Sequence, residues 1–148
     1  MEGTVIELFT PATLTDEALA ACHLIRREVF IEGQDVPASI EVDGRDAACA
    51  HVLLRVDGAP VATARLRVAD GGAKAERVAV LMAHRGRGYG HHVMEALEKY
   101  AAAEGHAEII LGAQVQVVSF YEARGYVAYG EPYEEAGIQH RMMRRALP

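Results

Sequence analysis

Three glycines and two arginines lie together in one short segment, Arg85-Gly86-Arg87-Gly88-Tyr89-Gly90. An apolar run at 76–82, typical of a buried strand, precedes this segment, and a helical pattern follows it to about residue 104. Glycine lets the backbone turn tightly and approach a ligand without a Cβ in the way. The N–H groups at the start of the following helix attract anions, and Arg85 and Arg87 add positive charge there. The segment therefore predicts a phosphate-binding loop; the alternative is a glycine-rich turn whose two arginines are merely solvated.

Two common phosphate motifs do not fit this loop. The pattern GxxxxGK[ST] of nucleotide triphosphatases is absent from the sequence. The dinucleotide pattern GxGxxG fails because its third glycine would fall on His91. The pattern that remains is [Q/R]-x-x-G-x-[G/A], which is matched by Arg85, Gly88 and Gly90.

This pattern resembles the pyrophosphate loop of the GNAT superfamily of N-acetyltransferases. A second segment, Phe120–Tyr126 (FYEARGY), is similar to that family's (F/L)YxxxG(F/Y) signature and follows the loop at the family's spacing. The likeness covers most of the chain. Further features look like the ElaA-like subgroup, namely Arg26, Glu28, Val29, Phe30, Glu32, Gln34, Val36, Pro37, Glu41, Asp43, His51, Ala113, Gln114, Ile138, His140 and Met143.

The resemblance implies that acetyl-CoA binds as a co-substrate and that no metal takes part. Tyr121 is implied to be the general acid that protonates the departing thiolate; the alternative is an aromatic side chain packed in the core. Gln114 stands where the family often has asparagine, so it keeps the amide but lengthens the arm. The residues implied to contact acetyl-CoA are Val78, Ala79, Val80, Arg85, Gly86, Arg87, Gly88, Tyr89, Gly90, Gln114 and Tyr121.

The acceptor amine needs a base, because a free alkylamine has a pKa of about 10.4 and is mostly protonated at neutral pH. His140 and Glu41 are the candidate bases, and Glu41 with Asp43 is a candidate site for a cationic amine. A core histidine and a solvated acidic loop are the respective alternatives. The set of Glu41, Asp43, His51 and His140 has no metal-site spacing, so no metal is predicted.

The predicted reaction moves an acetyl group from acetyl-CoA to an amine of a small molecule or peptide, by direct attack in a ternary complex. One alternative is an acyltransferase like the acyl-homoserine-lactone synthases, which the pairs Arg26/Phe30 and Asp43/Asp46 resemble. The other alternative is a CoA-binding module without catalysis.

The secondary-structure pattern predicts one α/β domain over residues 1–148, with a twisted mixed sheet of about six or seven strands flanked by helices. The expected order is strand, helix, three strands, helix, strand, helix and two strands. From the resemblance, we expect the strands at 76–82 and 107–112 to splay apart and admit the pantetheine arm. The other strands are predicted at 3–9, 50–57, 60–69, 126–130 and 138–145, and the helices at 15–33, 90–104 and 115–124, with a polar loop at 33–48.

The composition and net charge limit the kinds of binding partner that we expect. The 148 residues carry a formal charge of −6, which gives no general attraction to nucleic acid or to an anionic membrane. No apolar stretch approaches the ~18 residues of a membrane span, and the start MEGTVIELF lacks the basic region of a signal peptide. We therefore expect a cytoplasmic protein that acts on a small-molecule or peptide amine, with a homodimer as a possible assembly.

Overall fold

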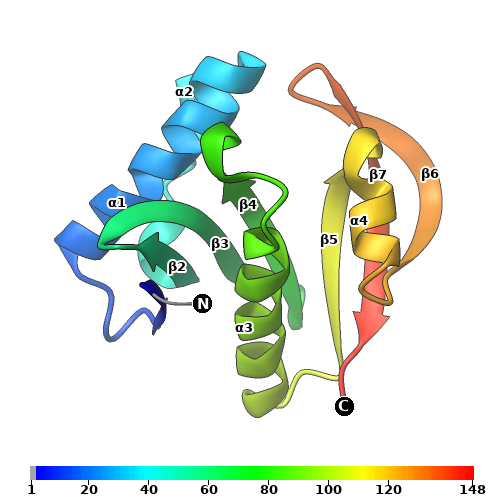
Figure 1. Cartoon of the computed structure of the whole chain (residues 1–148). Coiled ribbons are helices and arrows are strands. Elements are labelled where there is room, and N and C mark those ends of the chain that lie inside the picture. The colour runs from blue at the N-terminus through cyan, green and yellow to red at the C-terminus, as the bar shows by residue number, and fades with distance from the viewer. Residues whose placement is uncertain (1–2) are drawn as a thin grey trace.

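A seven-stranded sheet with helices on its faces forms the protein, as the computed structural model of residues 3–148 shows (Figure 1). The strands lie in the order β1-β2-β3-β4-β5-β7-β6, and β4–β5 is the parallel pair. The strands are β1 (Thr4–Phe9), β2 (Ala50–Val56), β3 (Ala59–Ala69), β4 (Gly72–Val80), β5 (Glu108–Gln114), β6 (Val127–Glu135) and β7 (Ile138–Ala146). The helices are α1 (Asp16–Arg26), continued by a π-helical turn (Arg27–Glu32), α2 (Ala38–Glu41), α3 (Tyr89–Ala103) and α4 (Val118–Glu122).

The predicted fold class and order of elements are confirmed. Thr15 caps α1 as expected, because its side chain accepts a hydrogen bond from the Ala18 N–H at 3.1 Å. Two details differ. The single turn of α2 lies inside the predicted polar loop, and β4 begins at Gly72 because Asp70 and Gly71, both with positive φ, close a tight hairpin after β3.

Alternating side chains of β2 and β3 build a core on each face of the sheet. Val52 and Leu54 point to the face covered by α3, in a cluster with Val93 and Leu97. Leu53 points the other way and packs with Cys22 and Ile25 of α1, along with Val29 and Ala79. The two helices thus fix β2, β3 and β4 between them.

The sheet opens between β4 and β5, as predicted. Their pairing is confined to Ala73–Ala75 against Ile109–Leu111, and beyond it the two ribbons diverge (Figure 1). A bulge marks the point of divergence, where Arg77 has a φ of +56° and the register with β3 shifts. Past the bulge, the edge of β4 that faces β5 has no strand partner within residues 3–148.

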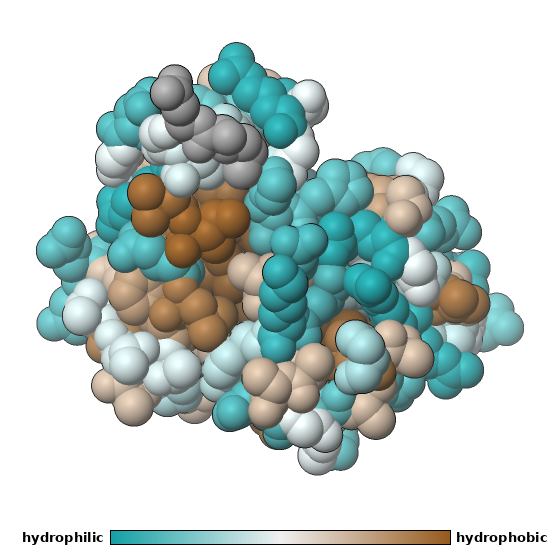
Figure 2. Space-filling view, turned by 60° about the horizontal axis from the view of Figure 1, so that its bottom comes forward, coloured by the Kyte–Doolittle hydropathy of each residue, from teal (hydrophilic) through white to brown (hydrophobic). Residues whose placement is uncertain are grey.

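An apolar surface lies away from this opening. Figure 2 shows hydrophobic side chains gathered on one side of the molecule, the side on which β1 and β2 lie in Figure 1, with hydrophilic side chains over much of the rest of that face. β1 is an edge strand of the sheet, and its Ile6 and Leu8 are 40% and 39% exposed. The expected homodimer stays a prediction.

Candidate functional site

A cleft of about 710 Å³ occupies the opening between β4 and β5. The glycine loop and the start of α3 line one part of it, and α4 adds Phe120 and Tyr121. The other part is lined by the π-helical turn and α2 on one side and by the β6–β7 hairpin on the other. The structure therefore brings almost all of the predicted cofactor residues to one cavity.

The glycine loop has the geometry of an anion site. Gly86 and Gly88 adopt left-handed φ angles of +79° and +84°, and a Cβ at either would meet nothing within 4 Å. Gly88 is the N-cap of α3 and offers no capping side chain, so the first N–H groups of the helix remain available to a ligand. Arg85 lines the cleft, and its Nε donates to the Val80 carbonyl at 3.0 Å. Arg87 is exposed beside it.

Gly90 is required by packing as well. A Cβ at this position would lie 3.1 Å from Cζ of Phe120, so glycine allows the start of α3 to approach α4 closely. Phe120 in turn lies against His91, with ring centroids 4.5 Å apart. The loop is thereby held next to α4, which carries the predicted general acid.

Tyr121 is 6% exposed and lines the cleft. Its ring makes edge-on contacts with Phe120 and Tyr126, at centroid distances of 5.0 and 5.6 Å. Its hydroxyl has no hydrogen-bond partner among residues 3–148. Burial raises the pKa of Tyr121, because the phenolate would lose its hydration, and the hydroxyl therefore keeps its proton at neutral pH.

A buried carboxylate that sequence reasoning missed holds this region together. Glu98 of α3 accepts a hydrogen bond from the Tyr126 hydroxyl at 2.7 Å, pairs with Arg124, and lies 2.9 Å from Nη1 of Arg145. It thus connects α3 to the end of α4 and to β7. The helical pattern did not indicate that Glu98 is buried, because the position directly follows the core residue Leu97 and so points in a different direction from the helix axis.

Gln114 lies at the end of β5 and is already engaged. It forms two amide hydrogen bonds with Gln34, at 3.1 and 2.8 Å, and accepts a third from Gln116. Gln34 follows the π-helical turn, so this pair joins the two sides of the cleft. The longer arm of glutamine at position 114 is what reaches this partner.

His140 of β7 is 7% exposed and lines the cleft. Its Nδ1 lies 2.7 Å from the Ile138 carbonyl, and a carbonyl only accepts, so Nδ1 must carry a proton. In the neutral ring the lone pair is then on Nε2, which has no partner within the described part of the chain. The Tyr133 ring stacks on the imidazole at 5.4 Å.

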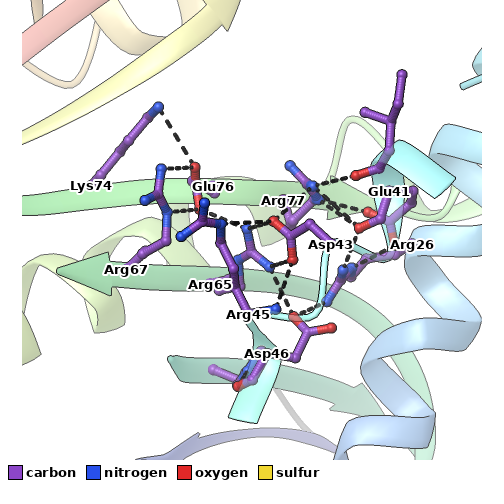
Figure 3. A network of polar contacts seen from close by, with 12 residues as sticks. Arg26, Glu41, Asp43, Arg45, Asp46, Arg65, Arg67, Lys74, Glu76 and Arg77 are labelled. Carbon is purple, nitrogen blue, oxygen red and sulfur yellow. Dashed lines mark hydrogen bonds and ion pairs between the residues drawn. The ribbon is translucent and has the colours of Figure 1, made fainter. Parts of the chain in front are cut away.

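Glu41 and Asp43 belong to a buried network of ion pairs (Figure 3). Arg26 Nε donates to Glu41 at 2.9 Å, and Nε of Arg77 lies 2.7 Å from its other oxygen. Arg65 donates to both oxygens of Asp43 at 3.0 and 2.9 Å, and these hydrogen bonds hold the pKa of that carboxyl well below its usual range. Asp43 does not line the cleft, and the side chain of Glu41 is only 2% exposed. The structure therefore gives both carboxylates partners other than a bound amine.

Asp46 and Glu76 complete the network from either end. Asp46 binds Arg26 at 2.8 Å and Arg65 at 3.0 Å, and Glu76 binds Arg65 at 2.7 Å. The network fastens the segment after α2 to α1, β3 and β4, on the side of the opening that α2 lines. Sequence reasoning saw the acidic loop but not its three buried or half-buried arginine partners, which are Arg26, Arg65 and Arg77.

The described residues contain neither a metal site nor a membrane-spanning helix. No group of three or more His, Cys, Asp or Glu side chains in residues 3–148 is placed to hold a metal ion. In the same range, no helix is long and apolar enough to cross a membrane.

Known proteins resemble this chain over nearly its whole length. Residues 12–147 match the sequence profile of the acetyltransferase (GNAT) domain. A Bacillus subtilis (strain 168) protein described as uncharacterized N-acetyltransferase YjcF is 40% identical over 129 residues, 86% of this chain and 92% of that protein. The crystal structure of Escherichia coli ElaA has a TM-score of 0.86 at 28% identity, covering 96% of this chain and 99% of ElaA. An acyl-CoA N-acyltransferase from Pseudomonas aeruginosa has the same score and coverage at 33% identity.

Proposed function

Because this chain belongs to the acetyltransferase (GNAT) domain family, we propose that it transfers an acetyl group from acetyl-CoA to the amine of a small molecule or peptide. The observation that carries the proposal is the cleft between β4 and β5. It is lined by the uncapped start of α3, by the protonated hydroxyl of Tyr121 and by His140, whose Nε2 has no partner within residues 3–148. This arrangement offers a phosphate site, a proton donor and a proton acceptor in one cavity.

Acetyl-CoA would lie along this cleft. The N–H groups at the start of α3, with Gly86, Gly88 and Arg85, would hold its pyrophosphate. The free edge of β4 at Val78–Val80 would pair with the amides of the pantetheine arm, as an added strand would. A backbone N–H of the same segment would donate to the thioester oxygen as it becomes negative.

The chemistry then needs protons to leave the acceptor nitrogen and one proton to reach the sulfur. The ammonium form of the acceptor gives a proton to Nε2 of His140, and the neutral nitrogen attacks the thioester carbonyl. A new C–N bond forms, and the C–S bond breaks to release a thiolate, which takes the proton of Tyr121. The nitrogen loses its second proton as the amide forms, and this proton restores the hydroxyl of Tyr121, while the proton on His140 passes to solvent. The net products are the amide, the free thiol and one released proton.

Of the two candidate bases, the geometry favours His140. Its Nδ1–H is fixed by the Ile138 carbonyl, which leaves Nε2 as an acceptor toward the cleft. Glu41 instead has both oxygens against guanidinium groups and almost no exposed surface. A base must lie within hydrogen-bond reach of the proton that it removes.

The experiment compares two glycine variants. Gly88→Val places a β-branched side chain on the proposed path of the pyrophosphate, and we expect acetyl-CoA affinity, measured by calorimetry, to fall at least roughly tenfold. Gly58→Val is the matched control, because Gly58 has the same φ of +84° in open space but lies in the β2–β3 turn.

Both variants carry the same backbone strain, so the difference between them reports the ligand contact. Equal affinities in Gly88→Val and Gly58→Val would refute binding at the loop. Release of free thiol from acetyl-CoA with an amine panel tests the transfer itself.

A further inference from the structure

The part of the cleft remote from the glycine loop has apolar walls. Val29, Phe30, Val36 and Ile40 line it on one side, and Ile138 lines it on the other. Val29 and Val36 are buried, Phe30 and Ile138 are half-buried, and Ile40 is 44% exposed at the rim. The end of the first helical segment and the tip of the β6–β7 hairpin stand on opposite sides of this same end of the molecule (Figure 1). An acceptor that enters here meets hydrocarbon on two opposite sides.

A flat aromatic surface lies within these walls. The Tyr133 and His140 rings are stacked at 5.4 Å with an angle of 22° between their planes. The Tyr133 hydroxyl is directed inward to Sδ of Met142 at 3.4 Å, over Gly112, where a side chain would collide with it. One ring face is covered by the imidazole of the proposed base, and because Tyr133 lines the cleft, the opposite face is the one left for a ligand. The hydroxyl is not turned toward a polar acceptor group.

The charges at this end are almost fully paired. Lys74 and Arg77 are the cations that line the cleft away from the glycine loop, and both lie against carboxylates: Lys74 is 3.6 Å from Glu76, and Arg77 contacts Glu41 and Asp43 (Figure 3). Among residues 3–148, an anionic group on the acceptor would meet no cation at this end that is without a carboxylate beside it. It would also meet the carboxylates that already hold these side chains.

One carboxylate at this end is left over. Glu135, at the tip of the hairpin, lines the cleft, is exposed, and has no ion-pair partner among residues 3–148. The remaining polar groups on this side are the neutral amides of Gln34, Gln114 and Gln116, which bond to one another. With its cations paired and one carboxylate unpaired, this end of the cleft favours a cationic ligand over an anionic one.

From this arrangement we infer that the acceptor is a primary amine with an apolar, preferably aromatic, body and no carboxylate or phosphate. The ammonium group passes Glu135 on entry, the body lies between the apolar walls and the Tyr133 face, and the nitrogen reaches Nε2 of His140. This inference rests on the proposed acetyl transfer and narrows its substrate.

Three amines with matched differences test it, with thiol release from acetyl-CoA as the readout. 2-Phenylethylamine has the inferred features, L-phenylalanine adds a carboxylate to the same body, and ethanolamine lacks the apolar body. We expect kcat/KM for 2-phenylethylamine to exceed the other two values at least roughly tenfold, because an unpaired carboxylate in this end of the cleft loses its hydration without gaining a partner.

Two arginine variants sharpen the test. Ile40→Arg adds a cation at the rim of the cleft, and we expect it to raise kcat/KM for L-phenylalanine about threefold to fivefold, the range that an exposed ion pair allows. Val42→Arg is the control, since Val42 is nearby and 51% exposed but does not line the cleft. In this variant, the ratio of kcat/KM for L-phenylalanine to kcat/KM for 2-phenylethylamine should match the wild type.

The outcomes separate the inference from the function on which it rests. Equal or better turnover of L-phenylalanine or ethanolamine would overturn the substrate class and leave acetyl transfer standing. Bound acetyl-CoA without turnover of 2-phenylethylamine would overturn the class as well. Absence of acetyl-CoA binding, checked by calorimetry on the same sample, would instead refute the proposed function.

Discussion

Removal of one oxygen, as in Tyr121→Phe, separates the proposed general acid from its packing role. The hydroxyl has no hydrogen-bond partner within residues 3–148, and both aromatic contacts of the ring survive the change. The free energy of unfolding should therefore change by well under the roughly 1 kcal/mol that a lost hydrogen bond costs. Affinity for acetyl-CoA should be nearly unchanged, because the ring keeps its place in the cleft and the hydroxyl acts on the sulfur mainly as the thiolate leaves.

The catalytic effect should be much larger. Loss of a general acid typically costs at least about 100-fold in kcat, which is about 2.7 kcal/mol in activation free energy. The raised pKa of Tyr121 adds a pH test, because the hydroxyl stays protonated well above neutral pH. Wild-type kcat should accordingly show no fall from Tyr121 ionisation between about pH 9 and 11, the range in which a tyrosine with the ordinary pKa of about 10 loses its proton.

Tyr126→Phe is the matched control, because the two tyrosine rings are neighbours with opposite roles. The Tyr126 hydroxyl donates to Glu98 at 2.7 Å, so its removal should destabilise the protein by about 1.5–3 kcal/mol while kcat falls far less. Urea unfolding and steady-state thiol release on both variants give the comparison. Wild-type kcat in Tyr121→Phe would refute the assignment and make Tyr121 a packing residue.

Two further predictions concern the ion network. Arg77 has a φ of +56°, and its side chain contacts Glu41. Arg77→Gly and Arg77→Ala both lose this contact, but only alanine keeps the backbone strain of a positive φ. Arg77→Gly should therefore be more stable than Arg77→Ala by about 1 kcal/mol in urea unfolding. Equal stabilities would show that the bulge relaxes when the arginine is removed. Stability should also fall as the pH is lowered. Hydrogen bonds from Arg65 lower the pKa of Asp43. Burial alone would raise the pKa of Glu76, but hydrogen bonds from Arg67 and Arg65 outweigh it and lower that pKa to about 2. The unfolded chain then binds more protons than the folded one, so the urea midpoint should decline from about pH 5 downward, through the unfolded pKa values near 4. A midpoint that is flat from pH 6 to 3 would contradict this.

Local pattern was enough to predict most of the fold and one end of the site. The glycine loop, the helix after it and the tyrosine of α4 are each defined by a few neighbouring residues, and alternation or helical periodicity predicts their elements from the sequence. The opening between β4 and β5 was expected from the family resemblance, and the confined pairing of these strands confirms it. The turn of α2 was missed because four residues are too few to show a helical period.

The acceptor end depended on contacts between distant residues. Whether Glu41 is a base or an ion-pair partner depends on Arg26 and Arg77, which lie on other elements, and the partner of Gln114 is 80 residues away. Likewise, the proton on Nδ1 of His140 follows from one carbonyl brought within 2.7 Å by the strand backbone. Periodicity in the sequence tells which way a side chain points from its own strand or helix. The choice among several carboxylates and several arginines is made only when packing sets their distances and removes water from between them, and tertiary structure alone does that.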